Sequence, residues 1–518
     1  MTDQTTETQQ KSGSGKISVI IILAIAIIGG AITLFLLFQS SDKQKYFSAE
    51  QDTYHFLKEE VEERFADELA WAELAQEKPT ESTIDISAEY QDPYAFGGVS
   101  EIEEMINNST ISIRTQADMK EKVMFADLQA DIAGMTFEDF RFNLTDTLLL
   151  VELPFLEEVL QLDSEDLGPL LHEIDPYTFE EDETYDFSPV FNSEDYPIPK
   201  EDREYLADKY GKFVYDELPD DAFSSDKEEV DVDGESIKAD KISVHLTEDQ
   251  VKTFVTSLLE EVESDERLRE ILEAYFEENF IPADELEMLM DDYDESLANM
   301  KDDVDNIELP EGIESTIWTD NGLIVQRHLE FSTEDAYGDE FTLAIEGTQL
   351  LEEEVQNFDY DINFSDTNLD ESVSLVAELS RDDEDMEDSI TIGVDGMELT
   401  YEGDETLKDS KRDFTRTLSV NSPEISGALV WTGDSEYEKD QMSSNHQLHV
   451  EADGIGADLL NVQLGVEGKQ VKEVESIDAQ NVKDLGKMSE SELDQYFEEE
   501  AAEQFFEWYM EKFGDVGF

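Results

Sequence analysis

Carboxylates are the most abundant side chains in this sequence that could do chemistry. The 518 residues include 133 Asp and Glu but only 34 Lys and Arg, which gives a formal net charge of −99. Paired carboxylates could catalyse glycoside hydrolysis, but with so many acids every spacing occurs and none is informative. The best match to a calcium loop is Glu229-x-Asp231-x-Asp233-Gly234, which ends at Asp240. It lacks the usual first Asp and the final bidentate Glu, so we interpret it as a β-hairpin with an Asp-Gly turn.

Two further acidic clusters could bind hard cations. Asp366, Asn368 and Asp370 are spaced like calcium ligands, but Glu371 stands where such a loop needs glycine. The second cluster lies on an expected helix and consists of Asp291, Asp292, Asp294 and Glu295. We interpret the first as a turn and the second as a solvated helix face. The sequence therefore predicts no metal site and no cofactor.

Motifs for nucleophilic catalysis are equally weak. Ser40-x-x-Lys43 and Ser224-x-x-Lys227 have the spacing of a Ser–Lys pair. Neither is followed by the partner motifs that a penicillin-binding enzyme requires. The sequence contains no Gly-x-Ser-x-Gly elbow and no P-loop. We therefore expect no catalytic residue and no enzyme.

Soft metal ligands are also scarce. The chain has no cysteine, which excludes disulfides, thiolate zinc sites and catalytic thiols. Its six histidines are scattered. His446 and His449 lie three residues apart in an expected strand, so their side chains should point to opposite faces and not bind one metal.

The negative charge extends through the whole sequence instead of forming an acidic tail. Strong self-repulsion is relieved when salt of a few tenths molar shortens the Debye length below about 8 Å. We interpret the charge as an adaptation of the surface to concentrated salt, as in a halophilic bacterium. Non-specific nucleic-acid binding needs clustered Lys and Arg, so we expect no nucleic-acid partner. The hydrophobic fraction of 39% predicts a folded chain.

One uncharged apolar segment, ISVIIILAIAIIGGAITLFLLF, occupies residues 17–38. As a helix it would span about 33 Å, slightly more than the roughly 30 Å of a bilayer's hydrocarbon. Large residues from Phe35 to Phe38 stand where a signal-peptide cleavage site needs small ones. The segment therefore predicts an uncleaved single-pass anchor in the cell membrane. Residues 1–16 would form a cytoplasmic tail, and the C-terminal domain would be extracellular.

After this segment, the spacing of the apolar residues divides the chain into regions expected to be helical and regions expected to form strands. Residues 39–80 have helical spacing, which predicts an amphipathic helix or stalk. Alternating patterns predict two halves of curved antiparallel sheet, over 81–245 with an acidic insertion and over 311–485. Residues 246–310 should form a helical block between the halves, and 486–518 a C-terminal helix. The expected fold class is α+β, with an N-terminal transmembrane helix before these elements.

Local signals mark several of the expected boundaries. Thr247-x-x-Gln250 and Ser489-x-x-Glu492 are capping boxes, each followed by apolar residues at helical spacing. Pro79 should end the first amphipathic helix. These signals predict where helices begin and end, but not which elements lie side by side.

Several motifs spread over nearly the whole chain point to a known family. They are Lys45-Tyr46-Phe47-x-Ala49-Glu50, Glu77-Lys78-Pro79-x-Glu81-Ser82-Thr83, Leu153-Pro154-Phe155-Leu156, Gly168-x-Leu170-Leu171-His172-Glu173-Ile174-Asp175-Pro176, Trp318-Thr319-Asp320-Asn321-Gly322-Leu323-Ile324 and Gly347-Thr348-Gln349-Leu350. The chain resembles an uncharacterised family of membrane-anchored exported proteins of Gram-positive bacteria. The resemblance implies no activity, because the family has none assigned. More remotely, long curved sheets with helices against one face are similar to lipoprotein-carrier folds.

Together these observations predict a non-enzymatic, membrane-anchored module that binds a ligand outside the cytoplasm. Its expected partners are a membrane, contacted through residues 17–38, and a lipid, an envelope polymer or an envelope protein. One alternative is an envelope hydrolase whose site is assembled from distant acidic residues. The other is a surface cation-binding protein.

Overall fold

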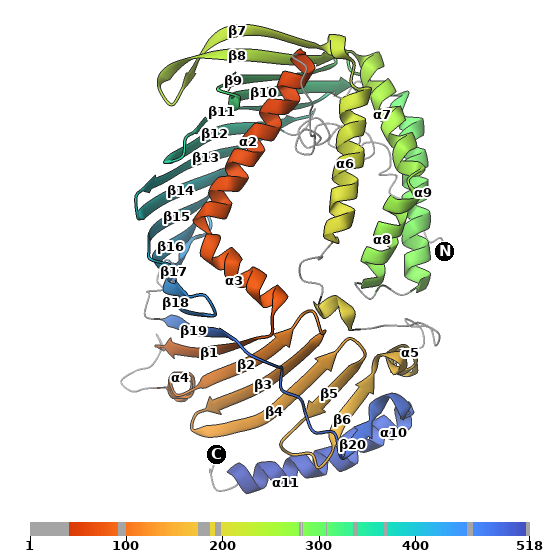
Figure 1. The fold of residues 1–518 in the computed structure, drawn as a ribbon, viewed down its shortest axis with the longest axis vertical. Coiled ribbons are helices and arrows are strands. Elements are labelled where there is room, and N and C mark those ends of the chain that lie inside the picture. Colours follow the sequence, from red (N-terminus) through yellow and green to blue (C-terminus); the bar gives the residue numbers. More distant parts are fainter. Residues whose placement is uncertain are drawn as a thin grey trace, which may run out of the picture.

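The structure is a computed structural model of the 518-residue chain. It describes residues 41–91, 100–174, 187–191, 198–278, 281, 283–306, 308–334, 340–366, 370–452 and 459–513. One continuous sheet of 20 strands dominates the described residues (Figure 1). The strands are β1 (Thr80–Tyr90), β2 (Thr110–Asp118), β3 (Val123–Ile132), β4 (Met135–Thr145), β5 (Leu148–Glu152), β6 (Val159–Asp163), β7 (Phe223–Val232), β8 (Glu235–Leu246), β9 (Ile313–Asp320), β10 (Leu323–Glu334), β11 (Glu340–Leu351), β12 (Val355–Ser365), β13 (Asp370–Asp382), β14 (Asp385–Val394), β15 (Met397–Lys408), β16 (Lys411–Asn421), β17 (Ser426–Tyr437), β18 (Gln441–Ala452), β19 (Leu460–Gln470) and β20 (Val482–Asp484).

The order of strands across the sheet departs from chain order. From one edge, β7 to β19 follow one another, then β1 to β6, and finally β20. Neighbouring strands are antiparallel throughout, except that the three-residue β20 runs parallel to β6. The sheet curves round so that β7 and β20 lie far apart, at opposite ends of the molecule (Figure 1).

Tight turns explain why consecutive strands pair as hairpins. Asp233 and Gly234 have positive φ angles of 54° and 79°, and Val232 pairs with Glu235 across them. Two successive residues with positive φ form a turn whose twist matches that of the strands it joins. This confirms the interpretation of the Asp-Gly segment as a hairpin and not a calcium loop. Asp395 and Gly396 turn the chain between β14 and β15 in the same way.

Helices lie on one face of the sheet and at its ends (Figure 1). The helices are α2 (Asp42–Arg64), α3 (Ala66–Glu77), α4 (Glu101–Asn107), α5 (Leu167–Ile174), α6 (Lys200–Glu217), α7 (Glu248–Glu263), α8 (Glu266–Glu278), α9 (Ala283–Val304), α10 (Glu490–Gln495), a π-helical turn (Tyr496–Ala501) and α11 (Ala502–Phe513), with 3-10 turns at Ser164–Asp166, Ser188–Phe191, Asp220–Ala222 and Leu485–Lys487. We call the face that carries α2 and α3 the inner face, and the opposite face the outer face. Both expected capping boxes form, at Thr247 and Ser489.

The largest apolar core lies near the β7 end of the sheet. There the first half of α2 packs among β8 to β11 and the helices α6, α7 and α9. Tyr46 and Phe47 are completely buried, and the Tyr46 hydroxyl lies 2.7 Å from Ser315 Oγ. Glu50 accepts two hydrogen bonds, of 2.7 and 2.6 Å, from the guanidinium of Arg327. The beginning of α2 is therefore fixed by both apolar burial and a buried ion pair.

The predicted fold class was wrong. The protein is mostly β, with one sheet where two halves were expected, because β19 pairs with β1 along eleven register positions. The helices of residues 246–310 pack beside one end of this sheet and not between two halves (Figure 1). The expected anchor at residues 17–38 lies outside the described residues. Within the described part of the chain, no helix is both long and apolar enough to cross a membrane.

Candidate functional site

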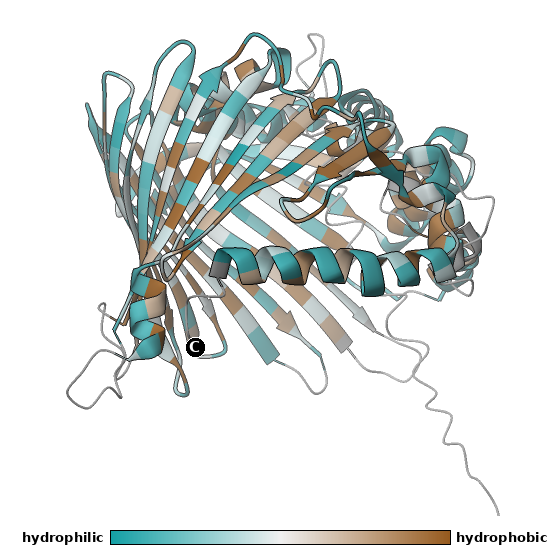
Figure 2. Cartoon of the chain, turned by 90° about the horizontal axis from the view of Figure 1, so that it is seen from below, coloured by the Kyte–Doolittle hydropathy of each residue, from teal (hydrophilic) through white to brown (hydrophobic). Residues whose placement is uncertain are grey.

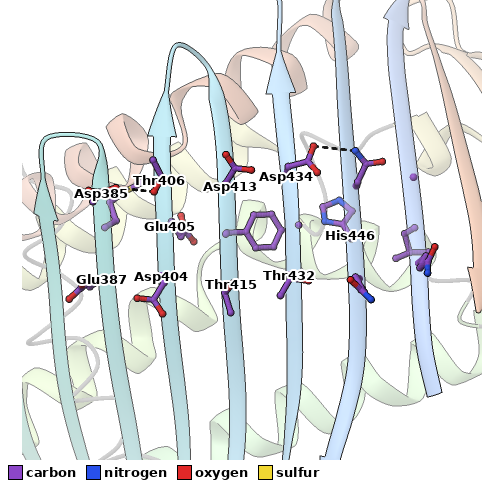
Figure 3. A pocket seen from close by; sticks show the side chains of 18 of the residues that line it. Asp385, Glu387, Asp404, Glu405, Thr406, Asp413, Thr415, Thr432, Asp434 and His446 are labelled. Atoms are coloured by element: carbon purple, nitrogen blue, oxygen red, sulfur yellow. Dashed lines mark hydrogen bonds between the residues drawn. The ribbon is translucent and has the colours of Figure 1, made fainter. Parts of the chain in front are cut away.

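A shallow trough of about 870 Å³ crosses the outer face from β14 to β19 and on to β1. Three consecutive residues of each strand from β14 to β19 line it, so inward-facing residues such as Glu405 and His446 also border the trough (Figure 3). Its carboxylates are Asp85, Asp385, Glu387, Asp404, Glu405, Asp413 and Asp434, and hydroxyl and amide groups lie between them. Among the described residues no Lys or Arg lines it. The outward-facing acids are spread over β1 and β14 to β17, with Asp385 and Glu387 both on β14, so the trough is a polar, acidic surface.

The inner face of the same strands carries a buried cluster of ion pairs. We call the cluster the latch; it consists of Arg64, Glu68, Asp388, Glu405, Arg412 and Arg416. Arg64, the last residue of α2, donates from Nη1 to Asp388 Oδ1 at 2.9 Å and from Nη2 to Oδ2 at 2.5 Å. Arg412 donates to Glu405 at 2.5 Å, to Glu68 of α3 at 3.0 Å and to the Arg64 carbonyl oxygen at 2.6 Å. The latch therefore joins both helices to β14, β15 and β16.

Glu405 is the centre of the latch. Its carboxylate accepts from Arg412 and, at 2.8 Å, from Arg416 Nε, and it lies 3.4 Å from Arg64 Nη2. Its side chain is only 1% exposed. Burial alone would raise the pKa of Glu405, but the charges of Arg416 and Arg64 outweigh burial and hold this pKa below its ordinary value. Glu405 is therefore ionised at neutral pH and balances the nearby guanidiniums.

Residues 54–77, the end of α2 and all of α3, depend on the latch more than on apolar packing. We call them the strap. The buried residues of α2 all lie between Lys43 and Thr53, and no residue of α3, which is fully described, is buried. Val61 and Leu69 are 57% and 47% exposed. Polar contacts of the latch thus supply most of the attachment of the strap to the inner face, with a cation–π contact of Arg412 to the Phe65 ring at 5.1 Å.

Beyond the strap the inner face carries a row of exposed apolar side chains, which we call the apolar surface. It consists of Ile392 (38% exposed), Leu399 (36%), Leu418 (51%), Leu429 (37%), Val450 (46%) and Leu460 (41%). The strand register places Ile392 beside Leu399, and Leu418 beside Leu429, which in turn lies beside Val450. Figure 2 shows that hydrophobic bands cross neighbouring strands of the sheet. A contiguous apolar patch on a very acidic protein is typical of a surface that meets a ligand or a membrane.

An aromatic group lies between the latch and the apolar surface. The Arg416 guanidinium stacks on the rings of Phe414 and Trp431, at 4.3 and 4.8 Å from their centres. Trp431 Nε1 donates to His446 Nδ1 at 3.3 Å. Burial, and then the charge of Arg416, lower the pKa of His446, which favours the neutral ring that this hydrogen bond requires. His446 faces inward with Phe414, whereas His449 pairs with Val430 on the outer face, so the expectation that the two diverge is confirmed.

The other residues singled out in the sequence do not converge on a site. Lys43 is buried and donates to the Leu218 carbonyl oxygen at 2.5 Å, while Ser40 lies outside the described residues. Ser224 and Lys227 are three residues apart on β7 and so point to opposite faces. The acidic residues of 291–295 lie along α9. Asn368 is also outside the described residues.

One acidic group was not visible in the sequence. Asp163, Asp166 and Asp484 bring carboxylate oxygens within 4.8 Å of one another. They come from the end of β6, the following turn and β20, which are brought together only by the pairing of β20 with β6. Lys487 already forms an ion pair with Asp166, so the group is partly neutralised by the protein itself.

Comparisons with known proteins gave structural matches only. No family model and no curated protein matches the chain. Among solved structures, a loop-deletion mutant of OmpT, an outer membrane protein of Vibrio cholerae, is 8% identical, with 76% of this chain and 97% of that one covered and a TM-score of 0.19. OccK3 (OpdO) of Pseudomonas aeruginosa is 5% identical, with 76% and 94% covered and a TM-score of 0.23. CymD, a monoaromatic hydrocarbon channel, is 8% identical, with 77% and 90% covered and a TM-score of 0.17.

These findings correct the family, function and location expected from the sequence. The expected Gram-positive family of single-pass exported proteins was wrong, since the matches include an outer membrane protein and a channel. The same findings contradict the predicted binding module and its two alternatives, a hydrolase and a cation-binding protein. They also contradict the predicted location as a single-pass protein of the cell membrane. Association with a membrane agrees with the matched outer membrane protein. The segment from which this association was expected, residues 17–38, lies outside the described residues. At TM-scores of 0.17 to 0.23, the similarity does not itself assign this chain an activity.

Proposed function

We propose that this protein transports molecules with hydrocarbon chains, such as membrane lipids, along the inner face of its sheet. The observation that carries the proposal is the apolar surface, which stays exposed although the molecule has a net charge of −99. Each of its side chains is already about half-buried or more, so complete removal from water by a ligand would gain roughly 0.5–1.5 kcal/mol per side chain. Leaving six such side chains uncovered is costly unless an apolar molecule covers them for part of the time.

The size of the apolar surface suits a chain lying across the strands. Neighbouring strands are about 4.8 Å apart, so the five steps from β14 to β19 extend over about 24 Å. One leaflet contributes about half of the roughly 30 Å hydrocarbon thickness of a bilayer. The surface is therefore longer than one lipid chain, and a chain could move along it without leaving apolar contact. That geometry favours transport over retention at one position.

The two faces of the sheet have opposite chemistry, which would direct such a molecule to the inner one. The outer trough is lined mainly by carboxylates, hydroxyls and amides, which water solvates when no ligand covers them. A hydrocarbon chain placed there would remove water from these groups without replacing their hydrogen bonds. The inner face instead offers Leu418, Leu429 and Val450 in adjacent register positions.

The strap covers the other half of the inner face. Met386, which is 4% exposed, lies beside Val61 and Arg64 of the strap, and Phe414, two strands away in the same register row, is 7% exposed. Release of the latch would uncover these residues and lengthen the apolar route towards β13. We propose that the strap controls how much of the inner face is open to the transported molecule.

A lipid-transfer assay tests the proposal. The full chain is reconstituted in donor vesicles that contain a self-quenched fluorescent lipid, and dequenching is followed after acceptor vesicles are added. We expect the double variant Leu418→Asp, Leu429→Asp to transfer lipid at least tenfold more slowly, because a chain on the surface would have to desolvate two carboxylates.

The matched control is Val376→Asp, which adds one exposed charge to the outer face. Val376 is 43% exposed and pairs with Asp359 and Thr391, so this variant should keep the wild-type rate. Wild-type transfer no faster than that of protein-free vesicles would refute the proposal. Equal rates for the double variant and the wild type would refute it as well.

A further inference from the structure

The C-terminal helical segment, residues 490–513, exposes a second group of large apolar side chains. Phe497 is 45% exposed, Phe505 45%, Phe506 63% and Met510 49%. We call these four residues the terminal patch. Phe506 and Met510 are one helical turn apart on α11 and so lie on the same side of it. Figure 1 shows this helix at the end of the molecule farthest from β7.

The opposite side of the segment is fixed to the sheet, so Phe506 and Met510 are held outward, while Phe505, whose ring centre lies 5.2 Å from that of Phe155, stands at the border of the terminal patch. Trp508 lies 6.1 Å from Phe137 and 6.5 Å from Phe140, both on β4, between ring centres. Tyr496 is 1% exposed, and Lys483 lies 4.3 Å from the centre of its ring. Gln504 Oε1 accepts from the Glu157 backbone N–H at 3.1 Å. With these contacts in place, Phe506 and Met510 cannot turn towards the sheet.

The helix is continuous with the apolar inner face. Phe137 pairs with Ala130, Ala130 with Ile111, and Ile111 with Ile86. This row of register partners belongs to the same face as the apolar surface, since Ile86 pairs with Leu464, the partner of His446. The terminal patch therefore stands where the apolar side of the sheet reaches the end of the molecule.

Charge around the terminal patch limits what can cover it. The exposed acids beside it are Glu498, Glu499, Glu503, Glu507 and Glu511, with Lys512 as the neighbouring base. A second copy of the chain would bring an identical acidic rim against this one, and an anionic surface would be repelled in the same way. A zwitterionic lipid surface offers hydrocarbon without net charge. Aromatic side chains are also favoured at the boundary between hydrocarbon and headgroups.

We infer that the terminal patch is the surface with which the protein contacts a zwitterionic lipid bilayer, so that lipid passes between that bilayer and the inner face. The inference rests on the proposed transport function but concerns a separate surface. Phe506 and Met510 enter the interfacial region, and the glutamates remain in water beside the headgroups. Trp508, between the patch and the sheet, then comes close to the acyl chains.

Tryptophan quenching tests the inference in the full chain. The chain has four tryptophans, and a variant with Trp71, Trp318 and Trp431 changed to Phe retains only Trp508. It is reconstituted in phosphatidylcholine vesicles with brominated acyl chains, at about 1 M salt, where the Debye length is about 3 Å. We expect at least twofold quenching of Trp508. Adding Phe506→Asp and Met510→Asp should abolish the quenching, and the milder Phe506→Ala and Met510→Ala should reduce it.

Two further single-tryptophan chains separate this inference from the proposed function. A chain that keeps only Trp431 reports on lipid at the apolar surface, whereas one that keeps only Trp318, which is 8% exposed beside β8, is the unquenched control. Trp508 without quenching overturns the inference even if Trp431 is quenched. The inference is also overturned if Trp508 is still quenched in the variant with Phe506→Asp and Met510→Asp, because the lipid would then reach Trp508 from the inner face. Quenching of Trp508 without quenching of Trp431 supports the inference and counts against the transport proposal.

Discussion

Replacing Glu405 with glutamine should release the strap while the beginning of α2 stays in place. Glu405 is the shared partner of Arg412 and Arg416 and lies 3.4 Å from Arg64. The substitution keeps the shape of the side chain and removes its charge, which leaves buried guanidiniums with too few counter-ions. Breaking a buried ion pair in this way costs about 3–5 kcal/mol.

This cost should appear locally and not as global unfolding. The residues of α2 up to Thr53 are held in the main core, where Tyr46 and Phe47 are fully buried. The strap has no buried residue of its own beyond that point, so it opens at a lower free energy than the core. A loss of about 3 kcal/mol corresponds to a more than hundredfold fall in protection from hydrogen exchange.

Hydrogen exchange measured by mass spectrometry checks this prediction. Peptides from residues 54–77 of the Glu405→Gln variant should exchange at least a hundredfold faster, and those from 42–53 at the wild-type rate. The control is Glu436→Gln, which breaks an exposed pair with Lys411 and should change exchange by less than tenfold. Unchanged protection of 54–77 in Glu405→Gln would show that the latch does not hold the strap.

The pH dependence has a definite sign. The pKa of Glu405 is lower in the folded chain than its ordinary value, so its contribution to stability is fully present above the unfolded-state pKa of about 4.3. That contribution is lost as the pH falls through the folded-state pKa. Exchange of the strap in the wild type should therefore accelerate in acid. The acceleration should be smaller in Glu405→Gln, which lacks this carboxyl group.

Two other buried carboxylates give further predictions. Asp265 accepts hydrogen bonds of 2.8 Å from both Tyr205 and Tyr210; although burial raises its pKa, hydrogen bonds lower it to about 2. Asp265→Asn should therefore cost about 2 kcal/mol at neutral pH, and the difference in urea denaturation should disappear as the pH falls from about 4 to 2. Glu50→Gln, which leaves Arg327 buried without its partner, should lower the free energy of unfolding by about 3–5 kcal/mol. A loss below 1 kcal/mol in either variant at neutral pH would contradict this view of the core.

Local structure was predictable from the sequence because its causes are local. The Asp233–Gly234 hairpin and the capping boxes at Thr247 and Ser489 depend on residues at most three positions apart, and all of them form. Within the segment 39–80, for which an amphipathic helix was expected, the structure has two helices, α2 and α3, and only the first half of α2 has buried residues. Alternating apolar residues predicted strands within 81–245 and 311–485, where the structure has its strands.

The arrangement of the sheet was not predictable in this way. The pairing of β1 with β19 joins segments at opposite ends of the described chain, and no local periodicity specifies a partner. Two halves were expected because the helices of 246–310 interrupt the strand pattern in sequence, although they do not interrupt the sheet in space. The choice of partner is a property of the whole fold, set by which faces can be buried together.

The functional surfaces were hidden for a different reason. With 133 acids in the sequence, nothing distinguished Glu405 and Asp388 from the solvated carboxylates around them until Arg64 and Arg412 were placed beside them. Nothing in the sequence distinguishes Leu418 and Leu429 from strand residues that pack in a core. Their exposure follows from where the strap ends on the inner face, which depends on the length and direction of α2 and α3.

The two ends of the sheet explain how so long an array of strands can stay within one molecule. Among the described strands, β7 is paired only with β8 and β20 only with β6. An unpaired strand is a template for a strand of another molecule. Consecutive charged, exposed residues from Asp226 to Glu229 make β7 a repellent template, and β20 is only three residues long. The charge of β7 and the short length of β20 thus oppose pairing between the sheet edges of two molecules. The sheet can therefore end at both strands without a strand from another molecule.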